Sequence, residues 1–281
     1  MAMENEPGRP IAVVTGASSG IGLAAAEELA RRGWVVAVVG RDEGRLADAT
    51  ARVRAAAGAT GEAAVTAYQC NFAVLDEVRA LAETLRNQHP RIDLLANNAG
   101  GAFSRRKTTV DGFELTIQVN HLAHFLLSHL LRDRLSGGRI VNTSSGAHAS
   151  GRLDPSDLSS TRLGYRTFAV YGSAKQANIL FAAEAARRWP DIISTSYHPG
   201  VVRTRFGNDS RVVATFYRVM PGLRTPAKGA ETLVWLATVE ADGIVDGGYY
   251  LDRKLTRSAA RAADPQLASR LWEASLAAVA L

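Results

Sequence analysis

The chain has 281 residues, of which 47% are hydrophobic and 21% are charged, the composition of a folded protein and not of a disordered one. Its net charge of +6 comes from basic residues that are scattered among acidic ones, so it does not point to nucleic acid as a partner. The single cysteine, Cys70, excludes an intrachain disulfide and a cluster of thiolate metal ligands.

The first residues of the chain, 1–9, form a polar tail. They lack the basic and apolar parts of a signal peptide. No apolar run in the sequence approaches the ~18 residues of a spanning helix. We therefore expect a cytoplasmic protein without a membrane anchor.

From residue 10 onward, apolar runs rich in β-branched residues alternate with alanine-rich runs of helical periodicity. This alternation predicts parallel strands joined by helical crossovers. The expected fold is a single-domain, Rossmann-type, doubly wound α/β structure with a mainly parallel, seven-stranded sheet and helices on both faces. The segments with strand character are 11–15, 34–39, 65–69, 92–96, 139–143 and 192–197, with a seventh in the short aromatic run after Gly247-Gly248. Those with helix character are 20–32, 43–57, 75–88, 112–131 and a run around Lys175.

A glycine-rich turn, Thr15 to Gly22, joins the first strand to the first helix. Glycine permits a tight turn and a close approach by phosphate, and the start of a helix offers free N–H groups to an anion. The turn therefore predicts a dinucleotide site. Its candidate contact residues are Gly16, Ser18, Ser19, Gly20, Ile21 and Gly22.

The second strand ends at Val39-Gly40-Arg41. An acid at this point would bind the adenosine ribose hydroxyls, whereas an arginine would pair with a 2'-phosphate. Arg41 therefore favours NADP(H) over NAD(H), with Arg45 as a possible assistant. Asp42 directly follows Arg41 and weakens this argument.

Tyr171 and Lys175 have the spacing of a proton-transfer pair. An isolated tyrosine has a pKa of ~10, and a lysine four residues further along a helix lies on the same face and stabilises the phenolate. Tyr250 and Lys254 repeat the spacing. They follow Gly247-Gly248 in a run typical of a strand, which would separate them by about 13 Å, so only the first pair is expected to cooperate.

Six motifs in order resemble the short-chain dehydrogenase/reductase family over residues 10–255: the Thr15–Gly22 turn, Asn97–Gly100, Asn120, Ser144-Ser145, Tyr171 with Lys175, and Pro199-Gly200. Residues 111–131 and 270–275 are similar to the retinol dehydrogenase-like branch of that family and to its bacterial ketoreductases of polyketide-type products. The resemblance implies that residues 10–255 form the catalytic domain and that 256–281 are a C-terminal helical extension.

By the same resemblance, Tyr171 is the general acid and base, Lys175 holds the nicotinamide ribose, and Ser145, with Ser144 as the competing choice, binds the substrate oxygen. Asn120 would position a water that relays protons to Lys175. The remaining residues that the resemblance assigns to the cofactor are Asn98, Ala99 and Gly100 at the inner ribose, Asn71 and Phe72 beside the adenine, Pro199 and Gly200, and Val202 and Thr204 at the carboxamide.

Two segments are expected to shape the substrate pocket. The long interval between Ser145 and Tyr171 implies an inserted loop at 146–170. Residues 201–226 carry an amphipathic pattern that fits either a lid over an apolar substrate or helices packed at the periphery. The apolar N-terminal anchor of membrane-bound members is absent, which argues against a retinoid held in a bilayer.

These features favour an NADP(H)-dependent oxidoreductase that moves a hydride between nicotinamide and a carbonyl or secondary alcohol of a moderately apolar small molecule. The alternatives are a non-catalytic dinucleotide sensor, a retinol or steroid dehydrogenase, and a sugar epimerase or dehydratase. His121 and His124 lack acidic or cysteine partners, so no metal site is expected. Ser145 lacks the motif of a hydrolytic nucleophile. The family is commonly dimeric or tetrameric, which suggests a homodimer or homotetramer.

Overall fold

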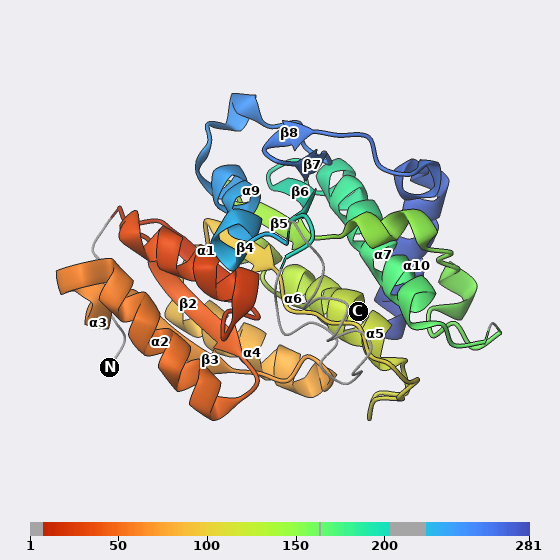
Figure 1. Ribbon diagram of the computed structural model, residues 1–281, viewed down its shortest axis with the longest axis horizontal. Helices are drawn as coiled ribbons and strands as arrows, with labels where there is room; N and C mark the ends of the chain where they lie inside the picture. Colours follow the sequence, from red (N-terminus) through yellow and green to blue (C-terminus); the bar gives the residue numbers. More distant parts are fainter. Residues whose placement is uncertain (1–7, 163, 203–222) are drawn as a thin grey trace.

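The computed structural model describes residues 8–162, 164–202 and 223–281, and its centre is one twisted sheet (Figure 1). The strand order is β3-β2-β1-β4-β5-β6-β7-β8. All neighbouring pairs from β3 to β7 are parallel, and β8 is antiparallel to β7. The predicted seven-stranded parallel sheet is therefore confirmed, with β8 as a short addition at one edge. The strands are β1 Ile11–Thr15, β2 Val35–Gly40, β3 Val65–Gln69, β4 Leu94–Asn97, β5 Arg139–Thr143, β6 Ile193–His198, β7 Tyr249–Leu251 and β8 Lys254–Leu255.

Helices cover both faces of this sheet, as the alternating sequence predicts. Successive side chains of β1 point to opposite faces, because the strand repeat is two residues. Ala12 and Val14 pack with α1, α2 and α9, whereas Val13 packs in the core that contains α4, α6 and α7. The α-helices of the described chain are α1 Gly20–Arg31, α2 Glu43–Ala57, α3 Gly61–Ala64, α4 Leu75–Gln88, α5 Leu115–Ile117, α6 Ala123–Leu130, α7 Thr167–Arg188, α9 Pro226–Thr238 and α10 Pro265–Ala278.

The C-terminal helix α10 lies along α7 (Figure 1). Its Trp272 is 3% exposed and inserts into a group of rings whose centroids lie 4.9 to 5.8 Å from its own. These rings belong to Phe125, His129, Phe181 and Trp189, and Arg188 lies over the indole at 4.9 Å. The C-terminal helix is therefore part of the main core and not a loose appendage.

The helix expected at 112–131 runs from Leu115 to Leu130 and contains a π-helical turn. A side-chain cap from Glu114, which accepts the N–H groups of Thr116 and Ile117, starts α5 at Leu115. A π-helical turn, Gln118–Leu122, then separates α5 from α6. Asn120 lies in this turn, where its side-chain amide donates to Thr116 O at 2.8 Å and to Gly101 O at 2.9 Å. The predicted helical run is therefore confirmed over 115–130, whereas its π-helical turn, which the bond from Asn120 to Gly101 O accompanies, was not predicted.

The expectation that Tyr250 and Lys254 lie along one strand was also wrong. The chain reverses at Asp252 and Arg253, which have φ values of 51° and 63°, and Leu251 pairs with Lys254 across the resulting hairpin. The Tyr250 ring is 2% exposed and its hydroxyl accepts the Val245 N–H at 2.7 Å, whereas Lys254 is exposed. Tyr250 and Lys254 therefore belong to a hairpin at the edge of the sheet, in which Tyr250 pairs with Leu255 and not with Lys254.

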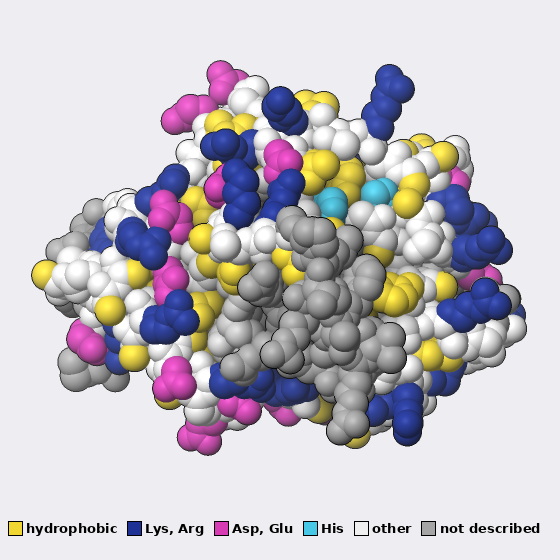
Figure 2. Space-filling model, viewed as in Figure 1, with side chains coloured by type: hydrophobic (Ala, Val, Ile, Leu, Met, Phe, Trp, Pro, Cys, Tyr) yellow, Lys and Arg dark blue, Asp and Glu magenta, His cyan; other side chains and the backbone are white. Residues whose placement is uncertain are grey.

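Charged side chains do not gather by sign on the face shown in Figure 2, where basic and acidic groups lie interspersed. Cys70 is 1% exposed, and burial raises the pKa of its thiol to about 12, which makes it a small core residue. No helix within the described ranges is both long and apolar enough to cross a bilayer.

Candidate functional site

A cleft of about 780 Å³ opens at the carboxyl ends of the parallel strands, where ligands bind in doubly wound sheets. Most residues that the sequence assigns to the site line this cleft. They are Gly16, Ser18, Ser19, Gly20, Ile21, Arg41, Asn71, Phe72, Asn98, Ala99, Gly100, Ser145, Tyr171, Lys175, Pro199, Gly200 and Val202. Gly22 and Asn120 support the cleft from behind, and Thr204 lies outside the described residues.

The glycine turn after β1 packs against the turn after β4. Gly16 and Gly20 have φ values of +66° and +59°, a backbone region that favours glycine. A Cβ on Gly16 would lie 2.7 Å from the Ala99 Cα, and one on Gly22 would lie 2.5 Å from the Asn98 side chain. Gly22 therefore allows α1 to approach the second turn, which explains its place in the motif without a ligand contact.

Thr15 fastens these two turns together, a role that the sequence did not reveal. Its hydroxyl oxygen accepts the N–H groups of Asn98 at 2.9 Å and Ala99 at 3.0 Å and lies 3.0 Å from Ala96 O. The Asn98 amide in turn donates to Thr15 O at 2.9 Å. The Thr15 side chain is fully buried, so its hydrogen bonds fix the floor of the cleft.

The start of α1 can accept an anion. Ser19 precedes the helix in an extended conformation, and its side chain does not cap the first turn. The first N–H groups of a helix need partners from outside the helix. This arrangement, together with the two glycines at positive φ, fits the diphosphate of a dinucleotide.

Arg41 follows β2 at the rim of the cleft and is exposed. Within the described chain, its guanidinium has no carboxylate partner. The carboxylate of the adjacent Asp42 instead caps α2, where it accepts the Arg45 N–H at 2.9 Å and lies 3.2 Å from the Arg45 Nε. These hydrogen bonds hold the pKa of Asp42 below its ordinary value. Arg41 is thus better placed than Arg45 to meet a phosphate.

Tyr171 and Lys175 lie on one face of α7, as the helical spacing predicts. The Lys175 Nζ is 5.5 Å from the centre of the Tyr171 ring and donates to Thr143 O at 3.0 Å. The two side chains are 8% and 3% exposed. Burial lowers the pKa of Lys175 to about 7, because removal from water disfavours the charged amine.

The two serines after β5 have different partners. Ser144 is buried, and its hydroxyl donates to Lys175 O at 2.8 Å. The Ser145 hydroxyl oxygen accepts the Ala147 N–H at 3.2 Å, a bond that leaves the hydroxyl proton available for an oxygen in the cleft. The geometry therefore favours Ser145 over Ser144 as the residue that binds substrate.

Asn120 braces the turn that follows β4. A Cβ on Gly100 would lie 2.3 Å from the Asn120 Oδ1 and 3.4 Å from the Lys175 Nζ, so only glycine allows these groups to approach. The Asn120 Oδ1 also lies 3.3 Å from the Gly101 N–H. The Asn120 side-chain amide donates to Gly101 O and to Thr116 O. The role of Asn120 in holding a relay water stays a prediction.

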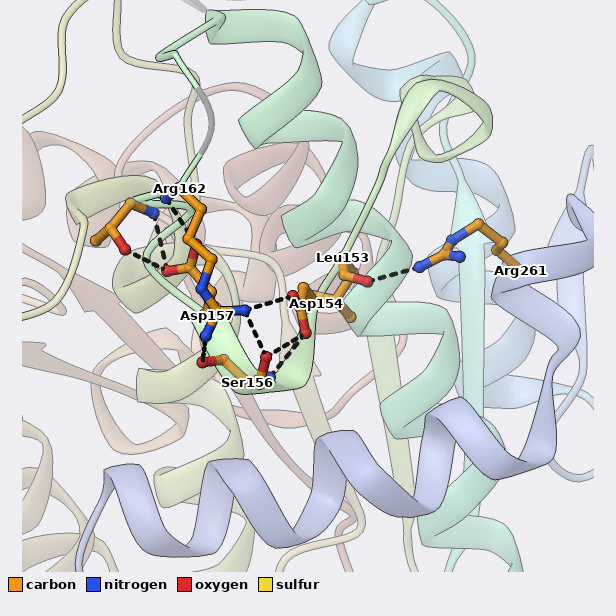
Figure 3. A network of polar contacts seen from close by, with 7 residues as sticks. Leu153, Asp154, Ser156, Asp157, Arg162 and Arg261 are labelled. Atoms are coloured by element: carbon orange, nitrogen blue, oxygen red, sulfur yellow. Dashed lines mark hydrogen bonds and ion pairs between the residues drawn. The ribbon is translucent and has the colours of Figure 1, made fainter.

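The segment between Ser145 and α7 contains two short 3₁₀ turns, Gly146–Ser150 and Pro155–Asp157. Helix α7 begins at Thr167, within the loop expected at 146–170. Arg162 donates to Asp154 and Ser156, and the Asp157 carboxylate accepts the Arg162 N–H at 2.9 Å (Figure 3). Hydrogen bonds among its own polar residues thus stabilise the inserted loop.

Apolar side chains also line the cleft. Ala102, Phe103, Phe168 and Val201 line it. Phe168 lies one turn before Tyr171 and is 54% exposed, an unusual state for a phenylalanine. The adjacent region 201–226, for which the sequence left a lid and a packed helix open, lies almost entirely outside the described residues.

Histidines do not form a metal site in this structure. Burial lowers the pKa values of His121 and His124 to about 3, so both rings are neutral at ordinary pH. His121 contacts the Ser275 hydroxyl at 2.9 Å, and His124 contacts the Thr15 hydroxyl at 3.1 Å. Over residues 8–162, 164–202 and 223–281, no group of three or more potential metal ligands occurs.

Comparisons with known proteins show the family of this chain. The family model described as short chain dehydrogenase matches residues 10–212. A Streptomyces sp. (strain C5) protein named "Putative daunorubicin C-13 ketoreductase" is 54% identical over 273 residues, which are 97% of this chain and 93% of the relative. Human retinol dehydrogenase 13 is 36% identical over 287 residues, covering 98% of this chain and 86% of that protein.

A solved structure supports the same assignment. The short-chain dehydrogenase from Sphingobium yanoikuyae in complex with NADPH is 28% identical, superposes with a TM-score of 0.64, and is matched over 80% of this chain and 82% of its own. The chain therefore belongs to the short-chain dehydrogenase/reductase family, in the branch that contains retinol dehydrogenases and bacterial ketoreductases.

Proposed function

We propose that this protein is an NADP(H)-dependent reductase of ketones, or in the reverse direction a dehydrogenase of secondary alcohols. The observation that carries the proposal is that Tyr171, Lys175 and Ser145 line the same cleft as the glycine turn. Bound NADPH would supply the hydride that reaches the carbonyl carbon. The protein then needs to supply a proton and to stabilise the carbonyl oxygen.

Tyr171 is the proton donor in this proposal. Its hydroxyl gives a proton to the carbonyl oxygen as the carbon gains the hydride, and the product is the alcohol. The adjacent Lys175 favours the resulting phenolate by its positive charge. Ser145 donates a hydrogen bond to the same oxygen, which stabilises the negative charge that develops there. In alcohol oxidation each transfer runs in the opposite direction.

Arg41 supports NADP(H) as the cofactor. Among the described residues its guanidinium has no carboxylate within ion-pair distance, and an arginine at the end of β2 is the group expected to bind a 2'-phosphate. The NADPH complex of a family member favours the same choice. Arg41→Ala should weaken NADPH binding about 10- to 100-fold and leave NADH binding nearly unchanged. Arg52→Ala is the matched control, because that arginine pairs with Glu27 and does not line the cleft. Equal losses for both cofactors would exclude the phosphate contact.

The substrate that we propose is an apolar, ring-containing ketone of polyketide type. The apolar lining around Phe103 and Phe168 fits such a molecule, and the name of the Streptomyces relative refers to a ketoreductase. A retinoid or steroid carbonyl is the second candidate, because a retinol dehydrogenase is also a relative. A panel of aromatic polyketide, steroid and retinoid carbonyls, followed by NADPH absorbance, would rank these classes.

Tyr171→Phe tests the reaction. With any substrate that the wild type reduces, this variant should consume NADPH at the background rate while it binds NADPH with normal affinity. Unchanged turnover would refute the mechanism. A wild type that binds NADPH but turns over no member of the panel would favour a non-catalytic sensor. The cytoplasmic location and the homodimer or homotetramer remain predictions from the sequence.

A further inference from the structure

The ring of His148 has a defined protonation pattern. The backbone N–H of Ala259 donates to its Nε2 at 3.0 Å, and a backbone amide can only donate. The Nε2 is therefore unprotonated, and the Nδ1 carries the ring proton. The Nδ1 lies 2.7 Å from Ser145 O and 3.5 Å from the Tyr249 hydroxyl. His148 is thus a neutral bridge between the carbonyl of Ser145 and the C-terminal segment.

The Ser145 carbonyl accepts two hydrogen bonds, both from His148. It accepts the His148 ring N–H and also the His148 backbone N–H at 3.0 Å. Ser145 itself is extended and begins the 3₁₀ turn Gly146–Ser150, in which the Ala147 N–H points to its hydroxyl oxygen. Because the same turn fixes the carbonyl and the hydroxyl, a change in the turn would move the hydroxyl.

The other side of this turn rests directly on α7 beside Tyr171. A Cβ on Gly172 would lie 2.5 Å from Ala147 O, and a Cβ on Gly151 would lie 2.6 Å from Gly172 O. The turn therefore lies between the backbone of α7 and the chain near Ala259. Arg261, from the same C-terminal segment, donates to Leu153 O at 2.8 Å (Figure 3) and ties down the chain that follows the turn.

From these contacts we infer that His148 is a positioning residue for Ser145. Its ring holds the turn against α7, so that the Ser145 hydroxyl and the Tyr171 hydroxyl meet the same substrate oxygen. The C-terminal segment takes part in catalysis through the Ala259 N–H, although it lies far from the motifs in the sequence. The inference rests on the proposed role of Ser145.

Three substitutions separate the effect of the His148 bond to the Ser145 carbonyl from the effect of its bond to the Ala259 N–H. His148→Phe keeps the ring shape and removes both hydrogen bonds. His148→Asn can still donate from a position close to that of the Nδ1, and His148→Gln can accept near the position of the Nε2. We expect kcat for ketone reduction to fall about tenfold in His148→Phe, with the KM for NADPH unchanged. His148→Asn should recover most of the loss and His148→Gln little of it.

A double-mutant cycle shows whether His148 acts through Ser145. If it does, His148→Phe should cost about tenfold in the wild type and almost nothing in a Ser145→Ala background. His89→Asn is a matched control, since that buried histidine contacts the Tyr68 hydroxyl at 3.0 Å and does not line the cleft. It should leave kcat unchanged. Thermal unfolding of each variant, read with the kinetics, identifies any loss that comes from misfolding.

The outcomes that overturn the inference differ from those that overturn the proposed function. Wild-type kcat in His148→Phe, or the same tenfold loss in the Ser145→Ala background, would remove His148 from the mechanism and leave the reductase intact. An inactive wild type, or a fully active Ser145→Ala variant, would remove the proposed role of Ser145 and the inference with it. If His148→Phe does not fold, His148→Asn and His148→Gln still decide the question, because equal kcat values in the two would show that the bond to the Ser145 carbonyl does not position the Ser145 hydroxyl.

Discussion

Lys175 should make the stability of this protein depend on pH. Its amine is 3% exposed, and burial lowers its pKa to about 7 from the ordinary 10.5. In the unfolded chain the amine keeps its ordinary value. Between about pH 7 and pH 10.5 the unfolded state therefore binds one more proton than the folded state, so the free energy of unfolding rises with pH over this range.

Lys175→Met removes this titration while it keeps a side chain of similar length. The free energy of unfolding of the variant exceeds that of the wild type most at and below neutral pH, where the wild type must bury a charge. This excess becomes smaller as the pH approaches 10.5. The two pKa values imply that the difference in unfolding free energy between the variant and the wild type falls by about 3 kcal/mol from pH 6 to pH 9. The lost bond to Thr143 affects both pH values alike and cancels.

Urea unfolding of the cofactor-free wild type and variant at pH 6 and pH 9 measures this change. Other groups titrate equally in both proteins and also cancel. Lys254→Met is the control, because Lys254 is exposed and its replacement should give a difference that does not vary with pH. A pH-independent difference for Lys175→Met would show that the amine is not desolvated in the folded protein. The variant should in addition lack reductase activity.

Three further substitutions test the supports of the site. Gly172→Ala should lower kcat about tenfold, because its Cβ would lie 2.5 Å from Ala147 O. Gly44→Ala is the control on α2, where a Cβ has space, and it should raise the unfolding free energy by about 0.5–1 kcal/mol. Thr15→Val should cost about 1–3 kcal/mol in unfolding free energy and weaken NADPH binding measured by fluorescence titration, and unchanged affinity would exclude its role in fixing the cleft floor. Trp272→Ala should cost about 3–5 kcal/mol in urea unfolding, and a loss below about 1 kcal/mol would contradict the assignment of α10 to the main core.

Much of the fold could be predicted because it depends on local periodicity. The strand β1 and the helix α2 begin and end where the sequence pattern places them. The glycine turn could be recognised because φ values such as those of Gly16 and Gly20 favour a particular residue type. The placement of Tyr171 near Lys175 could be predicted because residues four apart lie on the same face of a helix.

The irregular parts could not be predicted in this way, because their causes lie far away in the sequence. The π turn at Asn120 is accompanied by bonds to Gly101, 19 residues away. His148 follows the Ser144-Ser145 motif by three residues, but its partner Ala259 is 111 residues away. The hairpin after β7 places Asp252 and Arg253 at positive φ without a glycine, so the sequence carried no turn signal at that point. Periodicity describes one element at a time, whereas these features depend on contacts between elements.

The pair Arg41 and Asp42 illustrates how a local contact can settle a conflict between neighbouring charges. Read from the sequence, an arginine that favours a 2'-phosphate is followed directly by an acid that would repel it. In the structure the Asp42 carboxylate accepts the Arg45 N–H and pairs with its guanidinium, as acids at the start of a helix commonly do. Its negative charge is thus balanced by α2 and by Arg45. Arg41 lies outside this ion pair, and its guanidinium at the end of β2 is why a cofactor with a 2'-phosphate is the one that we propose.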